Sequence, residues 1–440
     1  MSYSHVDTAN IYARQVISKK VAACKWVRLA CQRHLDDLNK SQQTDYPYYF
    51  DENEAQRFCE FMEMLPHVSA DWFGKTIELS PWQSFIFSCI YGWRRKRDKK
   101  RRFREAYIEV PRKNGKSLKA AGVSLFGLAL DGEYGAQVYC GATTRIQAFH
   151  VFKPAKLIVD NTPKLQSELG IESFASNLSC PATASKFEPL IGNPGDGGSP
   201  SCAVIDEYHE HKTDDLYQCM KTGTRSRKQP LIFIITTAGS NIGGPCYDKH
   251  LEVKKVLQGA QDNDRLFGII YTIDEEDDWT TVESLKKANP NFGISMDAED
   301  FIFDQEQAVL NTSQQNDFKT KHLNIWTSAK SAWLNLEDWN ACADKTLSLE
   351  NFKGDECWLC IDLASKIDIC ALVLLFKRII GSKDHYYAFG RFYLPEATVH
   401  YPSKNRSSYE TWVNDGHLIA TDGEEIDFNF IPILWTVFEL

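Results

Sequence analysis

No apolar run in this sequence approaches the roughly 18 residues that a membrane-spanning helix needs. The densest apolar stretches, residues 85–93 and 371–376, are far shorter. The first ten residues lack the basic region followed by an apolar region that marks a secretory signal. Internal repeats and low-complexity tracts are also missing. Without a signal, the thirteen cysteines indicate reduced thiols in a cytosol, so a membrane-spanning or disulfide-stapled protein is not expected.

Positive charge is in deficit: 50 Lys and Arg face 59 Asp and Glu, a net charge of −9. A protein that wraps nucleic acid with its whole surface should be basic. Any nucleic-acid contact must therefore be local, weak or shared among a ring of copies. The 440 residues are 43% hydrophobic and 25% charged, which is typical of a folded chain with room for two or three domains.

The first two thirds of the chain alternate between helical and strand patterns. Helical spacing of apolar residues predicts a helix over residues 11–38, and Asp51 with Glu54 predicts the capped start of another that runs to about residue 64. Five apolar runs then read as buried parallel strands: 106–110, 136–140, 202–206, 231–236 and 266–273. Such alternation predicts an α/β fold with helices on both faces of a parallel sheet.

A different pattern begins after Trp333. Strands are predicted over residues 357–362, 370–376 and 386–393, and a charged turn over residues 377–384 makes the last two a hairpin. We therefore expect a helical leader, an α/β domain, a linker and a second domain, over residues 1–65, 66–330, 331–353 and 354–440 respectively.

A phosphate-binding loop is predicted between the first sheet strand and a helix over residues 117–130. Its sequence is VPRKNGKS, residues 110–117. Gly115 lets backbone N–H groups turn toward phosphate oxygens, Lys116 supplies positive charge, and the Ser117 hydroxyl can bind Mg²⁺. Val110 replaces the first glycine of the G-x-x-x-x-G-K-[ST] pattern, so an incidental Gly-Lys-Ser stays open at this point. The side chains and N–H groups expected around the nucleotide are those of Arg112, Lys113, Asn114, Gly115, Lys116 and Ser117.

Acidic and hydroxyl residues end two of the other predicted strands. Asp206 and Glu207 follow the strand over residues 202–206, where Asp206 would hold Mg²⁺ and Glu207 would polarise the attacking water. A pair that only caps the next helix is the alternative. Thr237 follows the strand over residues 231–236, where a hydroxyl can sense a γ-phosphate. Upstream, the amide of Gln83 matches an adenine edge, although an exposed residue at a helix start has the same sequence signature.

Together and in this order these pieces resemble the large terminase subunit of tailed bacteriophages and prophages. The resemblance covers nearly the whole chain, to about residue 430, and the missing first glycine is itself typical of that family. The matching segments are residues 22–25, 65–67, 81–83, 111–117, 204–210, 236–239 and 362–365, with Asp368.

The resemblance implies a P-loop ATPase of the ASCE type that uses ATP and Mg²⁺ to pump double-stranded DNA into an empty capsid. It also implies a homo-oligomeric ring on the phage portal protein, a small terminase subunit as partner, and a place in the cytoplasm of the bacterial host with no membrane association. An arginine at the subunit interface would stabilise the transition state. Arg112 would act in cis and Arg227 from a neighbouring subunit, and a solvated or structurally paired arginine is the alternative for both.

The second domain resembles a ribonuclease H-like nuclease, which cuts concatemeric DNA with Mg²⁺ or Mn²⁺ held by several carboxylates. Asp362 lies in an otherwise apolar strand, where a buried carboxylate needs a metal or a polar partner. Asp368 is a second metal ligand in this interpretation, or a turn residue, and Asp427 matches a family turn. The apolar tail over residues 430–440 does not resemble the family. We therefore expect an incomplete nuclease domain and a chain that hydrolyses ATP without cutting DNA.

Three other features leave alternatives open. Residues 94–104 carry nine basic side chains against one acid, and either contact a phosphate backbone or form a solvated connection. Cys357 and Cys360 have no matching second pair for zinc, and His209 and His211 are interpreted as surface residues. A helicase-like translocase or an inactive prophage remnant is the alternative to a packaging motor.

Overall fold

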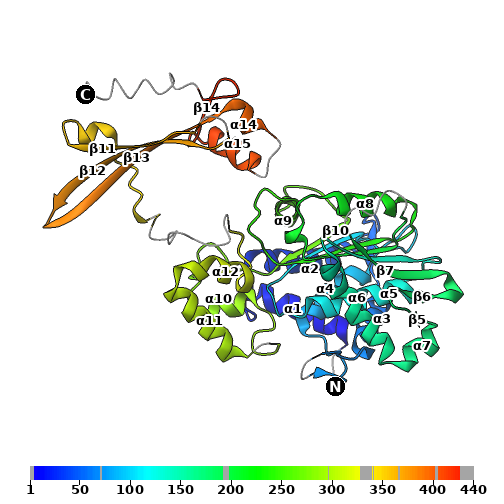
Figure 1. The fold of residues 1–440 in the computed structure, drawn as a ribbon. Coiled ribbons are helices and arrows are strands. Elements are labelled where there is room, and N and C mark those ends of the chain that lie inside the picture. The colour runs from blue at the N-terminus through cyan, green and yellow to red at the C-terminus, as the bar shows by residue number, and fades with distance from the viewer. Residues whose placement is uncertain are drawn as a thin grey trace. The chain divides into compact units, whose positions relative to one another are not determined.

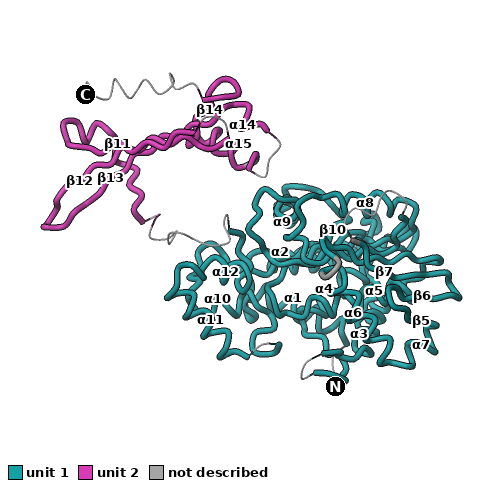
Figure 2. The backbone as a smooth tube through the Cα atoms, viewed as in Figure 1, with its two compact units in different colours: residues 1–334 teal, residues 335–440 magenta. Residues whose placement is uncertain are grey.

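The computed structural model describes residues 4–69, 72–191, 198–295, 297–327, 339, 341–364, 367–401 and 405–426. The chain divides into two compact units, residues 1–334 and 335–440 (Figure 2). None of the helices in the described residues combines the length and the apolar character that crossing a bilayer requires. The thirteen cysteines all lie in described residues, and none of them forms a disulfide.

Unit 1 is built around an eight-stranded sheet of order β10-β3-β9-β8-β4-β7-β6-β5 (Figure 1). Its strands are β3 (Glu105–Glu109), β4 (Gln137–Ala142), β5 (Glu172–Ser173), β6 (Leu178–Cys180), β7 (Ser185–Ile191), β8 (Cys202–Asp206), β9 (Leu231–Thr236) and β10 (Leu266–Ile270). Neighbours from β10 to β7 run parallel, and β6 and β5 add an antiparallel edge. The predicted parallel α/β sheet is therefore confirmed. The antiparallel edge was missed because β5 and β6 are only two and three residues long.

Helices cover both faces of this sheet, as predicted. They are α1 (His5–Ile17), α2 (Lys25–Lys40), α3 (Glu52–Met64), α4 (Pro81–Gly92), α5 (Lys116–Ala129), α6 (Arg145–Asp160), α7 (Pro163–Leu169), α8 (Asp215–Gly223), α9 (Pro245–Leu257), α10 (Val282–Ala288), α11 (Ala298–Leu310) and α12 (Thr312–His322). Right-handed crossovers place α5 and α6 on one face and α8 and α9 on the other (Figure 1). β3, β8, β9 and β10 are buried at every position, which explains the mostly apolar sequences between their ends.

The N-terminal segment contains two helices where one long helix was predicted. The first ends at Ile17, and Lys19 adopts a left-handed conformation with φ of 60°. A left-handed residue cannot continue a right-handed helix, so the chain turns and α2 begins at Lys25. The helix predicted after Asp51 is confirmed as α3, with the Asp51 side chain accepting from the backbone N–H of Glu54.

The basic segment over residues 94–104 is buried at both ends and exposed over residues 96–99, and neither interpretation of its sequence anticipated the buried arginines. With β1 (Tyr48–Phe50), β2 (Trp93–Arg95) forms a small antiparallel sheet, and the chain then turns back at Lys99. The guanidinium of Arg101 is buried in an ion pair with Asp131. Arg102 is equally buried and contacts Asp37 at 2.6 Å and Asp264 at 2.9 Å. These two arginines have a structural role, because their guanidinium groups are paired with carboxylates inside unit 1 and do not face DNA or solvent.

Unit 2 contains a four-stranded sheet of order β11-β12-β13-β14. The strands are β11 (Cys357–Asp362), β12 (Cys370–Ile380), β13 (Lys383–Pro395) and β14 (Ile419–Thr421), and the helices are α14 (Glu396–His400) and α15 (Arg406–Asn414). The hairpin is longer than predicted, because its turn lies at Gly381 and Ser382, which both have positive φ. The charged residues expected in the turn belong to the strands, where Lys377 pairs with Asp384 at 2.7 Å.

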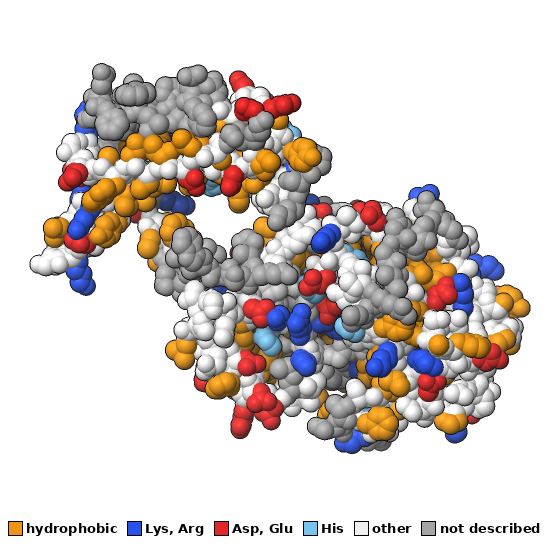
Figure 3. Space-filling view, viewed as in Figure 1, with side chains coloured by type: hydrophobic (Ala, Val, Ile, Leu, Met, Phe, Trp, Pro, Cys, Tyr) orange, Lys and Arg blue, Asp and Glu red, His pale blue; other side chains and the backbone are white. Residues whose placement is uncertain are grey.

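Hydrophobic side chains are exposed along unit 2 (Figure 3). In β11, Trp358 and Ile361 are about half exposed, and Ile379 in β12 is more so. The three small apolar clusters of this unit contain few buried residues each. Unit 1, in contrast, has one large core that joins its sheet to helices on both faces, with two smaller clusters beside it.

Candidate functional site

Three neighbouring strands of unit 1 end at one place. In the sheet order, β3, β9 and β8 are adjacent, with Glu109 opposite Thr236 and Ile235 opposite Asp206. Because these strands are parallel, the segments that follow them leave the same edge of the sheet. Ligands of open α/β sheets bind at this carboxyl edge, so the predicted phosphate loop, acids and threonines are brought together as expected.

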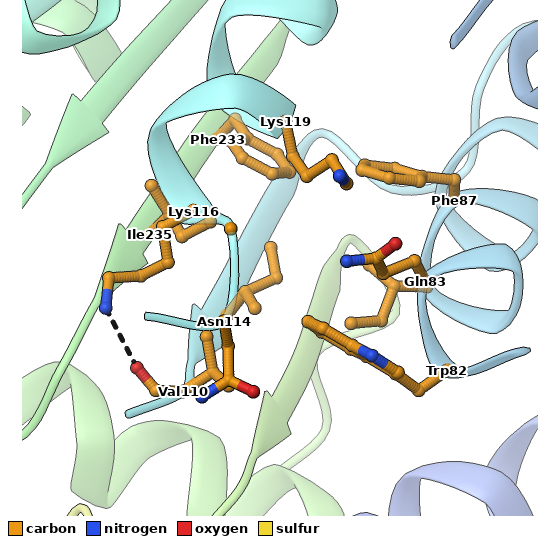
Figure 4. Close-up of a pocket in the computed structure, with 12 residues that line it drawn as sticks. Trp82, Gln83, Phe87, Val110, Asn114, Lys116, Lys119, Phe233 and Ile235 are labelled. Carbon is orange, nitrogen blue, oxygen red and sulfur yellow. Dashed lines mark hydrogen bonds between the residues drawn. The ribbon is translucent and has the colours of Figure 1, made fainter. Parts of the chain in front are cut away.

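The phosphate loop turns twice through left-handed backbone before helix α5 begins. Lys113 has φ of 68° and Gly115 has φ of 78°. The helix starts at Lys116, one residue earlier than predicted, so its free N–H groups face the loop. The ammonium of Lys116 donates to the carbonyls of Val110 and Pro111 at 3.1 and 3.2 Å (Figure 4). Burial lowers the pKa of Lys116, against the opposing effect of Glu207 and Asp206.

Asn114 secures the loop to a distant segment. Its amide nitrogen donates to Asn289 Oδ1 at 3.0 Å, and its amide oxygen accepts from the backbone N–H of Asn291 at 3.1 Å. The side chain is buried and fully engaged within the chain. The Asn114 side chain is therefore not free to contact a nucleotide. A contact from its backbone N–H stays a prediction. The neighbouring Arg112 and Lys113 side chains are exposed.

The two acids at the end of β8 have unlike environments. Burial and the neighbouring carboxylate of Glu207 raise the pKa of Asp206 to about 7. Burial acts the same way on Glu207, but contacts with His209 and Lys116 outweigh it and lower the pKa of Glu207. Glu207 has a left-handed backbone, with φ of 47°, and its N–H donates to Asp206 Oδ1 at 3.0 Å. Among the described residues, its buried Oε2 has no hydrogen-bond partner.

His209 is buried beside Glu207, which corrects its interpretation as a surface residue. It lies in the 3₁₀ turn η3 (Tyr208–Glu210), and only 7% of its side chain is exposed. Nδ1 lies 3.3 Å from Glu207 Oε2, and Nε2 lies 3.3 Å from Glu210 Oε1. Burial opposes a charged ring, but the two carboxylates outweigh it and raise the pKa of His209. His211 is buried as well.

Gln83 lines a pocket between helices α4 and α5 (Figure 4). It is buried, so the alternative of an exposed helix-start residue is wrong. Its Oε1 accepts from the backbone N–H of Ser80 at 3.1 Å and closes a capping box at the start of α4. Its Nε2 faces the pocket beside Gly115 and Trp82. Contact with adenine stays a prediction.

The same pocket contains Lys119, which the sequence analysis missed. Lys119 lies one turn after Lys116 and its side chain is buried, with no hydrogen-bond partner in the described part of the chain. Burial lowers its pKa from 10.5 to about 8. The unfolded chain therefore holds this proton more tightly, and the buried charge destabilises the folded state below pH 8. That penalty disappears as the pH rises through 8 toward 10.5.

Lys119→Met is therefore expected to raise the free energy of unfolding at pH 7 by about 3 kcal/mol, at about 1.4 kcal/mol per pKa unit. The gain should shrink by pH 9.5, since the wild-type lysine is then largely neutral in the folded state. Urea unfolding followed by tryptophan fluorescence at the two pH values measures it. Lys164→Met, at an exposed lysine of α7, is the control and should change little. A gain that did not vary with pH would contradict the assignment of the penalty to this charge.

The remaining predicted side chains of unit 1 fall into two groups. Arg227 donates to backbone carbonyls of its own chain, Ser199 at 2.7 Å and Gly135 at 2.8 Å, which matches the structurally paired alternative. Thr237 is buried and its hydroxyl lies 3.3 Å from His209 Nδ1. Ser117 is half-buried in the first turn of α5.

The two predicted nuclease acids lie at adjacent strand ends of unit 2. Asp362 ends β11 and is exposed, so the expectation of a buried carboxylate is wrong. Five of the six residues of β11 are exposed, Asp362 among them. Asp368 precedes β12 and accepts from the N–H of Ile369 at 2.9 Å, as a turn residue does. Asp427 lies outside the described residues, and within them no three potential ligands gather as a metal cluster would.

Two sequence families match the chain. Residues 81–255 match the family described as "Terminase large subunit, ATPase domain" and residues 260–438 match "Terminase large subunit, endonuclease domain". The second match begins inside unit 1 and includes β10 and helices α10 to α12.

Similar proteins agree with these matches. The chain is 51% identical over 243 residues to protein YmfN of Escherichia coli K12. The match covers 54% of this chain and 53% of YmfN, so the chain spans about half the length of that relative. It is 26% identical over 383 residues to the large terminase subunit of Enterobacteria phage HK97, covering 86% and 71%. The crystal structure of the HK97 large terminase has a TM-score of 0.54 at 23% identity, covering 87% and 77%, and supports the fold.

Proposed function

We propose, since this chain belongs to the terminase large-subunit family, that unit 1 hydrolyses ATP and uses the energy to drive double-stranded DNA into a capsid. One observation carries the proposal. Lys116 follows β3, and Asp206 and Glu207 lie at the end of β8, the strands on either side of β9, where both acids act on the Lys116 ammonium. The pKa values of the two acids are shifted in opposite directions. Acids whose environments separate their pKa values in this way usually have different roles.

The residues at this edge fit ATP with Mg²⁺. The buried ammonium of Lys116 donates to two carbonyls of its own loop. With a nucleotide bound, it would donate to phosphate oxygens instead. Ser117 and Asp206 would hold the metal ion, which also explains why a carboxyl with so high a pKa stands there. Glu207, ionised and with His209 Nδ1 3.3 Å from its Oε2, would position the attacking water. Gln83 would contact the adenine, and Thr237 the γ-phosphate.

Of the two candidate arginines, the structure favours Arg112. It is exposed on the phosphate loop itself, and its backbone N–H donates to Lys321 O at 3.0 Å, which fixes the loop without using the guanidinium. Arg227 would have to break its contacts with two backbone carbonyls before it could reach a neighbouring subunit.

The wider assembly belongs to the same proposal. It comprises a ring of copies on the portal protein, a small terminase subunit as partner, and action in the cytoplasm of the bacterial host. The proposed regions are a leader over residues 1–65, the ATPase domain over 66–330, a linker over 331–353 and a ribonuclease H-like domain over 354–440. Asp362 and Asp368 would bind Mg²⁺ or Mn²⁺ there, and the absence of DNA cutting by this chain stays a prediction.

Phosphate release by the purified chain tests the ATPase. We expect hydrolysis that requires Mg²⁺, stops when EDTA removes the metal, returns when Mg²⁺ is restored, and increases when double-stranded DNA is added. Asp206→Asn should weaken the response to Mg²⁺ and leave folding intact, because burial already raises the pKa of Asp206 to about 7 and the amide keeps the size of the side chain. No hydrolysis under any of these conditions would favour the inactive remnant, and unwinding of a DNA duplex would favour the helicase-like alternative.

A further inference from the structure

Three acceptor oxygens compete for one proton on His209. Nδ1 lies 3.1 Å from Thr236 Oγ1, 3.3 Å from Thr237 Oγ1 and 3.3 Å from Glu207 Oε2. A ring nitrogen carries at most one hydrogen. His209 therefore cannot bond fully to the acid and to the threonine hydroxyls at the same time.

The neighbouring hydrogen bonds assign the proton to Nδ1. Thr236 Oγ1 donates its own hydrogen to Thr237 O at 2.9 Å and accepts from the backbone N–H of His209 at 3.1 Å. Its contact with Nδ1 must then be one in which the ring donates. Glu207 Oε2, the third oxygen near Nδ1, has no other hydrogen-bond partner within the described residues. The Nδ1 proton thus lies between the strand-end hydroxyls and an oxygen that still needs a donor.

Close packing ties the ring to the loop after β9. A Cβ added at Gly239 would lie 3.0 Å from His209 Cβ and 3.3 Å from a ring atom of Trp326. The loop therefore rests directly on the imidazole, and a side chain at Gly239 would push it away. At the far end of the ring, Nε2 contacts Glu210. Any displacement of the loop must move Nδ1 relative to Glu207.

We propose that His209 is a positioning residue that ties the carboxylate of Glu207 to the hydroxyls of Thr236 and Thr237 through its single Nδ1 proton. The inference rests on the proposed ATPase function. When the Thr237 hydroxyl turns to a bound phosphate, the Nδ1–H group donates its hydrogen bond to Glu207 and holds the carboxylate in place for the attacking water. When the phosphate leaves, the Nδ1–H group donates to the threonine hydroxyls again, and Glu207 loses this hydrogen bond.

Two polar substitutions separate this role from a structural one. His209→Asn places an amide near the position of Nδ1, whereas His209→Gln places it near the position of Nε2. We expect kcat for ATP hydrolysis by His209→Asn to stay within about threefold of wild type, and kcat of His209→Gln to fall about 10–100-fold, the scale of a misplaced catalytic group. KM for ATP should change less than about threefold in both. Equal rates in the two variants, whether normal or reduced, would overturn the proposal.

A double-mutant cycle tests whether His209 acts through Glu207. If it does, adding His209→Gln to Glu207→Gln should change the residual single-turnover rate less than about twofold, because residues that act as a unit are not additive. Additive losses would overturn the proposal. The same substitutions at His150, an exposed histidine of α6, are the control and should leave kcat unchanged. A wild-type chain without ATPase activity would overturn the proposed function and the inference together, whereas normal hydrolysis by His209→Gln would overturn the inference alone.

Discussion

Glu207→Gln is expected to bind ATP as the wild-type chain does and to hydrolyse it at least about 100-fold more slowly, the usual loss for a missing general base. The substitution keeps the size of the side chain and the backbone hydrogen bond from Glu207 to Asp206. It removes a charge, because the pKa of Glu207 is lowered and the carboxylate is ionised near neutral pH. Steady-state phosphate release gives kcat, and the fluorescence of a labelled ATP analogue gives the binding constant.

Lys116→Ala provides the contrast. Its ammonium would contact phosphates before and during the reaction, so this variant should lose roughly tenfold or more in ATP affinity as well as turnover. Asp215→Asn, at an exposed acid at the start of α8, is the matched control and should behave as wild type. Near-normal turnover by Glu207→Gln would show that the attacking water is activated elsewhere, while unchanged affinity in Lys116→Ala would remove the lysine from the phosphate site.

The centre of the site was predictable because its determinants are local. Lys116 and Ser117 follow a strand and a glycine turn, and Asp206 and Glu207 follow an apolar run. For each motif, the strand or turn that positions it can be recognised from about ten neighbouring residues. Parallel strands end at a common edge, so their meeting follows from the fold class. The order of the strands, which makes β9 the neighbour of both β3 and β8, is not written in any local pattern.

The roles that the sequence concealed depend on residues far apart in the chain. Arg102 and its partner Asp37 are separated by 65 residues, and His209 and its partner Thr236 by 27. Runs of charged residues and lone histidines are usually solvated. Their burial can be recognised only when the structure shows which distant residue each of them pairs with. Asp362 shows the reverse case, because the apolar sequence suggested a buried strand, whereas every residue of β11 except Leu359 is exposed.

The buried pair of Arg101 and Asp131 should show its importance in stability rather than in DNA binding. The Arg101 side chain is fully buried, donates to Gln229 O at 3.1 Å and lies over the ring of Tyr91 at 4.8 Å. Asp131→Ala would leave that guanidinium without its counter-charge. Breaking a buried ion pair in this way costs about 3–5 kcal/mol, and we expect a loss of this size in the urea unfolding of unit 1, followed by tryptophan fluorescence.

The double variant decides whether the loss comes from the orphaned charge. Arg101→Met in the Asp131→Ala background removes that charge and fills the space with an apolar chain, so it should recover part of the stability instead of adding a second loss. Arg97→Ala is the control, because Arg97 belongs to the same basic segment but is 71% exposed, and exposed pairs contribute about 1 kcal/mol or less. If Asp131→Ala unfolded like wild type, and Arg101→Met instead reduced the salt dependence of DNA binding, the segment would be a DNA contact after all, as one interpretation of its sequence held.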